Sequence, residues 1–518
     1  MRGDRAGGWI DQTRSEVVAS RGMVATSQPL AAQVGLDVLR GGGNAADAAV
    51  ATAAALSVVE PGSTHLGGDM FALYWSARER RLFGLNASGW APAAWTPSAY
   101  GVITVPGAID GWHALLDRFG TMGFGDVLEP AVHYAEEGFP VSERVARDWA
   151  AEAAKLRSDP DSAATFLVDG AAPPAYSVFR NPSLARALRV LQEGGRDAFY
   201  DGPIARAIVG KLGGAMGYDD LREFRSEWVE PLSVPYRGFD VHELPPNGQG
   251  FGVLEMLRVL EGFDLAALGP RSPELWHLLV EAKKLVFADL EAYCGDPRFA
   301  DLPLDRLLSA EHAAALRSRI DPTRASAVAP GAAYAGGTVY LAAADRWGDI
   351  VSFIYSIYSA YGSGVTVPGY GFLLHDRGAL FSADPSSVNV VAGRKRPFHT
   401  IIPAFVTREG RPVMAFGSMG GSAQVQAQAT ELVNLLDLGM NVQAAGDAAR
   451  FRHDQDTGVL WLESRLFEAV GADLRAMGHD ARPCDGSLVG GYQAILVDEA
   501  GVYRGGSDFR KDGLVAGH

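Results

Sequence analysis

Residues 336–340 read Gly-Gly-Thr-Val-Tyr, and the character of the 518-residue chain changes at this point. Residues 321–337, which precede the threonine, are small and rich in proline and glycine, a composition that predicts an exposed linker. After them, Thr338–Ala344 and Asp349–Tyr358 have the composition of two strands joined by a turn. On its own, this pattern is typical of a flexible linker that enters a strand, and most threonines at such positions do no chemistry.

Helical patterning dominates before the linker, and strand-like runs dominate after it. Helices are expected from Pro29 to Leu39, from Asn44 to about Glu60, and over most of residues 112–319. Strands are expected at 401–406, 413–417, 460–463, 492–497 and 502–505. The regular alternation of a doubly wound parallel sheet is missing, so the pattern favours a layered α+β architecture. The polar residues 1–22 are interpreted as an arm.

A second glycine-rich stretch, Gly417-Ser418-Met419-Gly420-Gly421, lies between a predicted strand and a predicted helix over 423–437. Backbone N–H groups at the start of a helix can bind an oxyanion, so Gly420 and Gly421 are candidates for that role. The alternative is that this stretch is an ordinary strand-to-helix turn.

The composition excludes several classes of protein. Apolar residues make up 47% of the chain and charged residues 21%, which is an ordinary globular composition and excludes global disorder. Asp and Glu number 61 against 46 Lys and Arg, which gives a net charge of −15 and argues against nucleic acid as a partner. The 62 glycines follow no Gly-x-y period, so collagen is excluded as well.

The sequence carries no HExxH, P-loop or GxSxG motif, and its two cysteines lack CxxC spacing. We therefore expect no metal and no cofactor. A short glycine-rich run, Gly248–Gly252, resembles a nucleotide loop only loosely. Without a signal-peptide core or an apolar stretch long enough to cross a bilayer, the expected location is the cytoplasm, with no membrane partner.

The order and spacing of many short motifs resemble the gamma-glutamyltransferase family of N-terminal nucleophile hydrolases, from about Gly22 to His518. Each motif alone is weak, and together they are specific. They are Gly22–Ala25, Gly41–Thr52, Leu66–Gly68, Val105–Gly107, Glu137–Pro140, Leu260–Leu265, Gly337–Thr338, Lys395–Pro397, Gly420–Ser422 and Gly505–Asp508.

This resemblance implies a four-layer αββα fold and a chain that cuts itself between Gly337 and Thr338. The products would be a helix-rich large subunit, residues 1–337, and a strand-rich small subunit, residues 338–518, both within one layered unit. The new α-amine of Thr338 would act as the base for its own hydroxyl, because an α-amine has a pKa of about 7.7–8. Gly420 and Gly421 would bind the oxyanion, and Ser356 matches a second hydroxyl that the family needs for processing.

The expected substrate pocket departs from the glutamyl-specific members. Ser88 replaces the arginine that binds their substrate carboxylate. Tyr358, Arg377 and Leu380 replace the groups that bind the substrate amine, and His399-Thr400 replace paired serines. We expect Arg377 and His399 to grip a carboxylate near the scissile carbonyl, with hydrogen bonds from Tyr358 and Thr400. The alternative is that Arg377 is a structural ion-pairing residue.

The predicted function is a self-processing threonine amidohydrolase for a small anionic substrate, similar to the oxamate amidohydrolase branch of the family. The open alternatives are a true gamma-glutamyltransferase or glutathione hydrolase, a cephalosporin-type acylase, a member that cleaves C–C bonds in a natural-product pathway, and an unprocessed binding protein without activity. The expected partners are the small-molecule substrate and the two subunits of one precursor, which could assemble further into a homo-oligomer.

Overall fold

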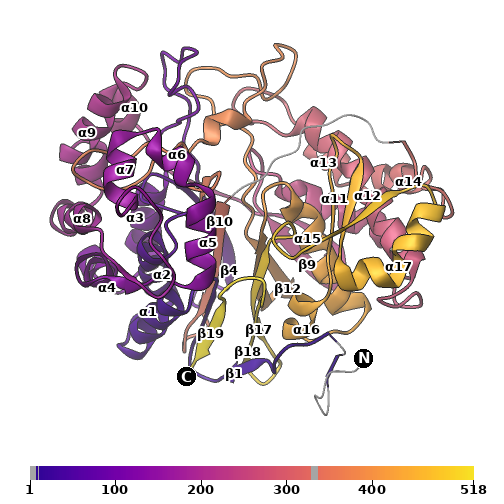
Figure 1. The fold of residues 1–518 in the computed structure, drawn as a ribbon. Coiled ribbons are helices and arrows are strands. Elements are labelled where there is room, and N and C mark those ends of the chain that lie inside the picture. The colour runs from indigo at the N-terminus through magenta and orange to yellow at the C-terminus, as the bar shows by residue number, and fades with distance from the viewer. Residues whose placement is uncertain (1–7, 10, 328–336) are drawn as a thin grey trace.

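The computed structural model describes residues 8–9, 11–327 and 337–518, and these form four layers. Two seven-stranded sheets face each other in the middle, and helices cover the outer face of each sheet (Figure 1). This arrangement is the αββα stack expected from the family resemblance, and it confirms the α+β class. Gly336 and residues 328–335 of the predicted linker lie outside the described residues.

The first sheet combines strands from both sides of the predicted cleavage point. Strand β10, the third of the seven, begins at Gly337 and pairs with β2 on one side and with the middle strand β11 on the other. In spatial order the strands of this sheet are β19 (Leu514–Gly517), β2 (Met23–Thr26), β10 (Gly337–Ala344), β11 (Ile350–Tyr358), β3 (Asp69–Ser76), β4 (Arg81–Ala87) and β7 (Glu227–Val229).

The second sheet is likewise built from both parts of the chain. In spatial order its strands are β1 (Val17–Ala19), β18 (Tyr503–Ser507), β17 (Gly491–Val497), β13 (Arg411–Met419), β12 (Ala404–Arg408), β9 (Phe239–Glu243) and β8 (Leu232–Tyr236). Two small sheets lie outside the stack: β14 (Phe451–His453), β15 (Val459–Glu463) and β16 (Asp480–Cys484), and β5 (Phe139–Pro140) with β6 (Val178–Phe179).

The helices form the two outer layers, on the left and right of Figure 1. Those on the side of the first sheet are α1 (Pro29–Arg40), α2 (Ala45–Val59), α3 (Ala108–Phe119), α4 (Phe124–Glu137), α5 (Glu143–Ala151), α6 (Ala153–Arg157), α7 (Pro160–Phe166), α8 (Pro182–Tyr200), α9 (Pro203–Leu212) and α10 (Tyr218–Arg222). Those on the side of the second sheet are α11 (Gly250–Leu260), α12 (Pro273–Tyr293), α13 (Leu304–Leu307), α14 (Ala310–Arg317), α15 (Ala423–Leu432), α16 (Val442–Asp447) and α17 (Ser464–Ala476).

Helix α2 shows why the alanine-rich segment packs as it does. All of its residues are buried, and its small side chains let it lie close to α1, α4 and strand β10. Asn44 and Asp47 form a reciprocal capping box at its first turn, so the predicted start of this helix is confirmed. The Asp47 carboxylate also accepts a hydrogen bond from the Thr121 hydroxyl, at 2.6 Å, which ties the helix start to the loop after α3.

Between the two sheets, apolar side chains from both fill a core, among them Phe71, Tyr340, Ile354, Phe405 and Ile495. Alternate residues of a strand point to opposite faces, so strands such as β10 and β11 bury one set of side chains against the helices and the other against the second sheet. Burial on both faces explains why these strands read as continuous apolar runs.

Two predictions about the chain need correction. The predicted polar arm is wrong for Val17–Ala19, which form β1 and pair with β18 at the edge of the second sheet. The segment expected to be mostly helical also contains strands β7, β8 and β9, and β8 and β9 complete the second sheet. These strands are short and alternate with polar residues, so their pattern is weak beside the neighbouring helices.

None of the helices in the described ranges is long and apolar enough to span a membrane.

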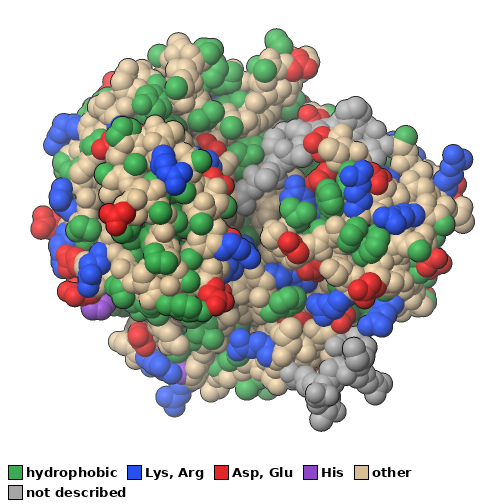
Figure 2. All heavy atoms as spheres, in the orientation of Figure 1, with side chains coloured by type: hydrophobic (Ala, Val, Ile, Leu, Met, Phe, Trp, Pro, Cys, Tyr) green, Lys and Arg blue, Asp and Glu red, His purple; other side chains and the backbone are tan. Residues whose placement is uncertain are grey.

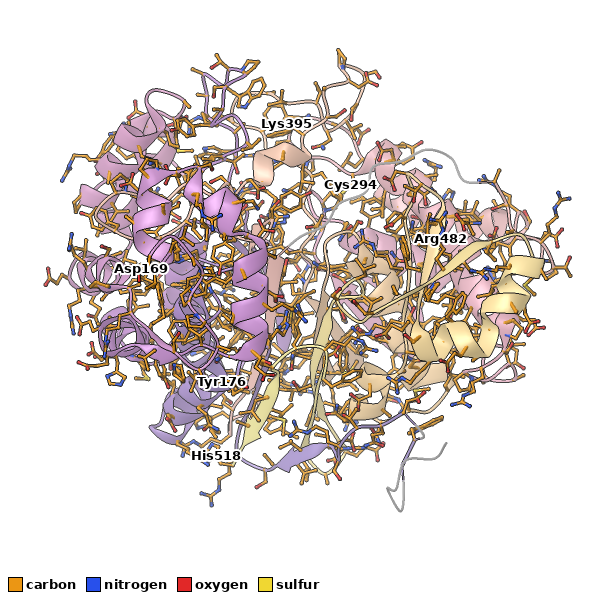
Figure 3. All side chains as sticks on the ribbon, in the orientation of Figure 1. Asp169, Tyr176, Cys294, Lys395, Arg482 and His518 are labelled. Carbon is orange, nitrogen blue, oxygen red and sulfur yellow. The ribbon has the colours of Figure 1, made fainter. Side chains whose placement is uncertain are left out.

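Cys294, at the C-terminal end of α12 (Figure 3), is buried and Cys484 is half-buried, and both are free thiols. On the face shown in Figure 2, cationic and anionic side chains are interspersed rather than separated.

Candidate active site

Thr338 lies at the N-terminal end of strand β10, where the ladder is irregular. Gly337 pairs with Tyr358 and Val339 with Tyr355, so the register shifts across Thr338. Such shifts in a sheet re-aim the side chains next to them and are frequent at active sites. Thr338 is 3% exposed, and it lines a cavity at the end of the two central strands.

The position before the threonine leaves little room for a side chain. A Cβ atom on Gly337 would lie 3.0 Å from the Gly62 carbonyl oxygen and 3.3 Å from the backbone of Ala360. Backbone therefore closes around the Gly337–Thr338 peptide from two sides. This close approach explains why glycine precedes Thr338.

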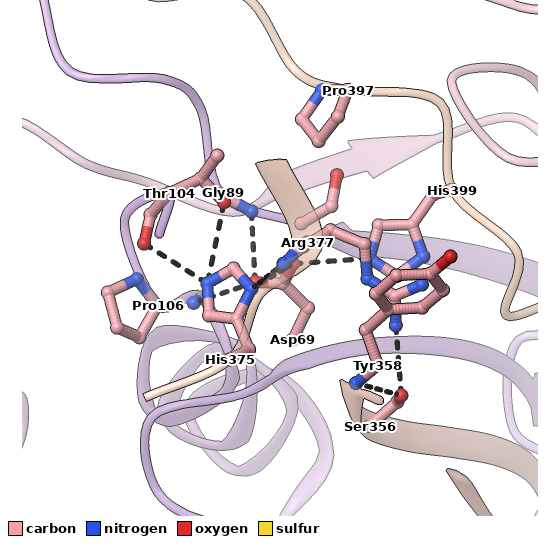
Figure 4. A network of polar contacts seen from close by, with 12 residues as sticks. Asp69, Gly89, Thr104, Pro106, Ser356, Tyr358, His375, Arg377, Pro397 and His399 are labelled. Carbon is pink, nitrogen blue, oxygen red and sulfur yellow. Dashed lines mark hydrogen bonds and ion pairs between the residues drawn. The ribbon is translucent and has the colours of Figure 1, made fainter. Parts of the chain in front are cut away.

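The Ser356 hydroxyl on β11 lies next to Thr338, and Figure 4 shows its contacts with Tyr358 and Arg377. Its oxygen accepts hydrogen bonds from the Tyr358 N–H at 2.9 Å, from Arg377 Nη2 at 2.9 Å and from the Thr338 hydroxyl at 3.2 Å. Because these donors saturate its lone pairs, its own proton is directed to the Gly337 carbonyl oxygen, 2.7 Å away. The hydroxyl thus polarises the carbonyl of the peptide bond that the sequence marks for cleavage.

Arg377 lies behind Ser356 and is fully buried. It belongs to a short 3₁₀ turn, Arg377–Leu380, and its Nη1 donates to the Thr400 hydroxyl at 2.8 Å. The guanidinium stacks over the Tyr358 ring at 4.7 Å, and no carboxylate within the described residues forms an ion pair with it. Burial lowers the pKa of Arg377 to about 10, against the opposing charge of Asp69. A positive charge is therefore held one hydroxyl away from Thr338.

Asp69, the first residue of β3, is the anion that balances this charge, and it was not among the residues predicted from the sequence. Its carboxylate accepts from the Gly89 and Gly107 amides at 3.0 and 3.1 Å and from His399 Nε2 at 3.1 Å. Burial alone would raise the pKa of Asp69, but His375, His399 and Arg377 hold it at about 2. A signal was present in the sequence: an acidic residue opens the otherwise apolar run at 69–76.

His399 is fully buried, and both of its ring nitrogens are engaged. Nε2–H donates to Asp69, so Nδ1 is the acceptor that faces the Ile401 N–H at 3.4 Å. Burial, reinforced by the charge of Arg377, lowers the pKa of His399 to about 3, so the imidazole ring carries no charge near pH 7. In this arrangement His399 positions Asp69 and brings no positive charge to a ligand.

The remaining predicted pocket residues are also placed in this region. Thr400 accepts from Arg377, and the Tyr358 ring covers the guanidinium. Tyr358 has a φ of 72°, an uncommon conformation for a residue with a side chain and one that often marks a functional site. Ser88 is fully buried, and its hydroxyl donates to the Asn86 side chain at 2.7 Å, so it fixes a loop next to the site.

The glycine loop after β13 has the form that an oxyanion site requires. Gly420 and Gly421 have φ values of 130° and 63°, which side chains rarely allow, and helix α15 begins just after them. Neither amide donates a hydrogen bond within the described part of the chain. Gln249 Nε2 holds the loop through the Gly421 carbonyl at 3.0 Å and the Thr400 carbonyl at 2.6 Å. The Gly248–Gly252 run therefore has a structural role, because its Gln249 side chain tethers the glycine loop to Thr400.

A cavity of about 430 Å³ lies in front of Thr338 and Gly420. Six cationic side chains and three acidic ones line it: Arg144, Arg147, Lys155, Arg452, Arg510 and Lys511, with Glu60, Asp148 and Glu152. A second cavity of about 290 Å³ runs past Gln249, Leu380 and Ser422, and no lysine or arginine is among the described residues that line it. Arg377, His399, Thr400 and Ser88 lie behind these walls and line neither cavity.

Two groups of side chains are close enough together to hold a metal ion: His277, Glu281 and His479, and Glu255, Asp289 and His312. Glu281 already binds the Lys284 ammonium at 2.7 Å, and His312 Nε2 lies within 3.1 Å of both carboxylates in its group. Neither group lines the cavity at Thr338. Hydroxyl, guanidinium and backbone groups thus make up the site.

The αββα stack, with a threonine opening a central strand beside a glycine loop, defines an N-terminal nucleophile hydrolase. The chain belongs to the gamma-glutamyltranspeptidase family, whose model matches residues 31–518. It is 39% identical to the glutathione hydrolase-like YwrD proenzyme of Bacillus subtilis, with 97% of this chain and 99% of that protein aligned. It is 35% identical to the oxamate amidohydrolase proenzyme of Klebsiella pneumoniae, over 97% and 100% of the two chains.

Solved structures agree with this assignment. The crystal structure of a cephalosporin acylase from Bacillus halodurans superposes with a TM-score of 0.93 at 39% identity, covering 99% of each chain. The structure of the gamma-glutamyltranspeptidase of Helicobacter pylori matches with a TM-score of 0.55 at 29% identity, over 59% of this chain and 92% of that one. The relatives therefore span several acyl-transfer activities on one fold.

The position of Arg377 gives a prediction that separates direct from indirect action on the substrate. We expect Arg377→Gln to slow self-cleavage and to lower kcat by about ten- to hundredfold, because hydrogen bonds to charged groups contribute about 1.5–3 kcal/mol. The loss should be equal for anionic and neutral substrates, since the guanidinium acts through Ser356. Steady-state kinetics on both kinds of substrate measure this. An increase in KM confined to anionic substrates would instead support the direct grip predicted from the sequence.

Proposed function

We propose that this protein is a self-processing threonine amidohydrolase that acts on a small anionic acyl or amide substrate, of which oxamate is the model. The cationic lining of the cavity at Thr338 carries this proposal. Six cations against three acids line that cavity, in a chain whose net charge is −15. A local excess of positive charge in a partly enclosed site attracts anions.

Self-cleavage follows from the contacts of Thr338 and Ser356. The Thr338 hydroxyl oxygen attacks the Gly337 carbonyl carbon, and the Ser356 proton, 2.7 Å from the carbonyl oxygen, stabilises the charge that develops there. Collapse breaks the Gly337–Thr338 C–N bond and passes a proton to the nitrogen, which leaves an ester on the threonine. Water then hydrolyses the ester. The products are residues 1–337, ending in a carboxylate, and residues 338–518, beginning with a free α-amine.

Turnover would reuse the same hydroxyl with the new amine as its base. The amine takes the proton of the Thr338 hydroxyl, which attacks the substrate carbonyl, and the amides of Gly420 and Gly421 hold the oxyanion. The leaving amine departs with a proton, and water releases the acid from the acyl-threonine. The buried guanidinium of Arg377 disfavours protonation of the nearby α-amine, because a neighbouring positive charge lowers the pKa of an amine.

The residues around the site favour this function over gamma-glutamyl transfer. A glutamyl substrate brings an α-ammonium group beside its α-carboxylate, so the cations around the cavity would favour it less than a substrate that carries the carboxylate alone. The similarity to a cephalosporin acylase keeps acylase activity as a second candidate, and cleavage of a C–C bond next to an oxalyl group is a third. We further propose a cytoplasmic location, in line with the two free cysteines, and a processed heterodimer that could assemble into a homo-oligomer.

A denaturing gel and a substrate panel test the proposal together. We expect the purified protein to separate into two bands, of 337 and 181 residues, and to hydrolyse oxamate faster than a gamma-glutamyl anilide or an acyl-lactam. A single persistent band would support a binding protein that keeps the fold without activity. Comparable or faster release of aniline from the gamma-glutamyl compound would identify a gamma-glutamyl enzyme instead.

A further inference from the structure

Lys511 differs from the other cations that line the cavity at Thr338, because it is the one without a partner among the described residues. Arg144 and Arg147 bind Asp148, and Lys155 binds Glu152. Arg452 binds Asp454, and Arg510 binds Glu463 and Asp508. No hydrogen bond or ion pair of the Lys511 ammonium occurs within residues 8–9, 11–327 and 337–518. Five of the six cations thus already contact a carboxylate, two of them the same one, and Lys511 is left for a ligand.

The position of Lys511 relative to the oxyanion loop follows from three glycines. Its aliphatic stem crosses Gly491, where a Cβ atom would lie only 2.5 Å from the Lys511 Cγ and 2.8 Å from its Cε. The neighbouring Gly490 packs on Gly420, since a Cβ atom there would lie 3.5 Å from the Gly420 Cα. The ammonium therefore enters the cavity next to the loop that would hold the reacting carbonyl.

The backbone that carries Lys511 is anchored on both sides. Arg510 donates to Glu463 at 2.5 and 2.7 Å, and the Ser142 hydroxyl donates to Asp512 at 2.5 Å. The Lys511 N–H donates to the Asp508 carbonyl at 3.3 Å within the same turn. A cation on such a fixed turn loses little conformational freedom when it binds a ligand.

The electrostatic setting also favours an anion. Burial, together with the charge of Arg144, lowers the pKa of Lys511 to about 8, although Glu60, Asp148 and Asp508 oppose the shift. The ammonium has given up part of its hydration without gaining a partner among the described residues. A carboxylate that binds it replaces the lost water contacts by a charge-assisted hydrogen bond.

We propose that Lys511 binds the carboxylate of the substrate's acyl group and so selects acyl groups whose carboxylate lies close to the scissile carbonyl. This inference rests on the proposed function, and it assigns the specificity to a residue outside the set predicted from the sequence. Lys511 fixes the anion while Gly420 and Gly421 face the carbonyl oxygen.

The test compares oxamate with oxamide, which has the same skeleton and no charge. In Lys511→Met, which keeps the stem and removes the charge, we expect kcat/KM for oxamate to fall about 10- to 100-fold, mainly through KM. The value for oxamide should stay unchanged, and Lys511→Arg should restore part of the loss. Arg411→Met, which removes an exposed cation at the start of β13, serves as the control variant. Equal losses on both substrates would overturn the proposal.

Calorimetric binding of oxalate tests the anion site without catalysis. We expect oxalate to bind the processed wild type and to bind Lys511→Met at least tenfold more weakly, with both proteins showing the same two bands on a gel. No binding to the wild type, or equal binding to both, would contradict the assignment of Lys511. If oxalate binding depends on Lys511 but oxamate is not hydrolysed, the anion site stands and the proposed substrate is wrong.

Discussion

Thr338→Ala should leave a single 518-residue chain that turns over no substrate. The substitution removes the hydroxyl that we propose attacks the Gly337 carbonyl and, with it, the route to the α-amine that we propose as the base. The two functions are lost together, so the effect is complete rather than partial. A denaturing gel of the purified variant, followed over days, measures the first loss, and a substrate assay at high enzyme concentration measures the second.

Thr338→Ser is the matched control for this substitution. It keeps a hydroxyl at the same position, so we expect both cleavage and turnover to persist at lower rates, because the serine hydroxyl lacks the methyl group that restricts its rotamer. Two bands from Thr338→Ala would show that another residue is the nucleophile. An intact Thr338→Ser chain would show that the hydroxyl alone does not suffice.

Ser356→Ala should slow self-cleavage by about 100- to 1,000-fold, the usual loss when one donor to a developing oxyanion is removed. The variant leaves the Gly337 carbonyl oxygen without its 2.7 Å donor and leaves Arg377 Nη2 without its acceptor. The measurement is the half-time for conversion of full-length precursor into two bands, starting from freshly purified protein.

Ser352→Ala controls for the loss of a buried hydroxyl from the same strand. The Ser352 hydroxyl lies 2.8 Å from the Tyr340 hydroxyl, between the two sheets and away from Gly337. We expect this variant to lose some stability and to cleave at the wild-type rate. If the two serine variants cleaved equally fast, the hydrogen bond from Ser356 to Gly337 would have no part in processing.

The residues that could be found from the sequence are those whose role depends on the backbone next to them. The position before Thr338 is crowded by backbone, and Gly420 and Gly421 have backbone angles that favour glycine. Glycines are therefore expected at these positions, and they form short motifs that can be recognised in the sequence. The helix cap at Asn44 was predictable for the same reason. Asp69 was missed because a single acidic residue at a strand start has many possible uses, and only the contact with His399 singles it out.

The contacts of the charged side chains around Thr338 could not be predicted from the sequence pattern. Arg377 and His399 are titratable residues at positions where glutamyl-specific members of the family carry different side chains. The sequence therefore predicted that the two residues bind a substrate carboxylate. In the structure, the guanidinium instead meets Ser356 and Thr400 behind the nucleophile, and His399 is occupied by Asp69. Lys511 was not among the residues predicted from the sequence, yet it lines the cavity, and its ammonium has no hydrogen-bond or ion-pair partner in the described part of the chain.

Local chain chemistry was thus enough to identify the family and the layered fold and to single out Thr338 and the glycine loop as candidates, because each depends on neighbours in sequence and on strand or helix period. The partners of the buried charges depended on packing between segments far apart in the chain. Asp69 and His399 are separated by 330 positions and meet at 3.1 Å. Whether a cation faces a ligand or a hydroxyl is decided by the side chains that desolvate it, and those become neighbours only when the four layers assemble.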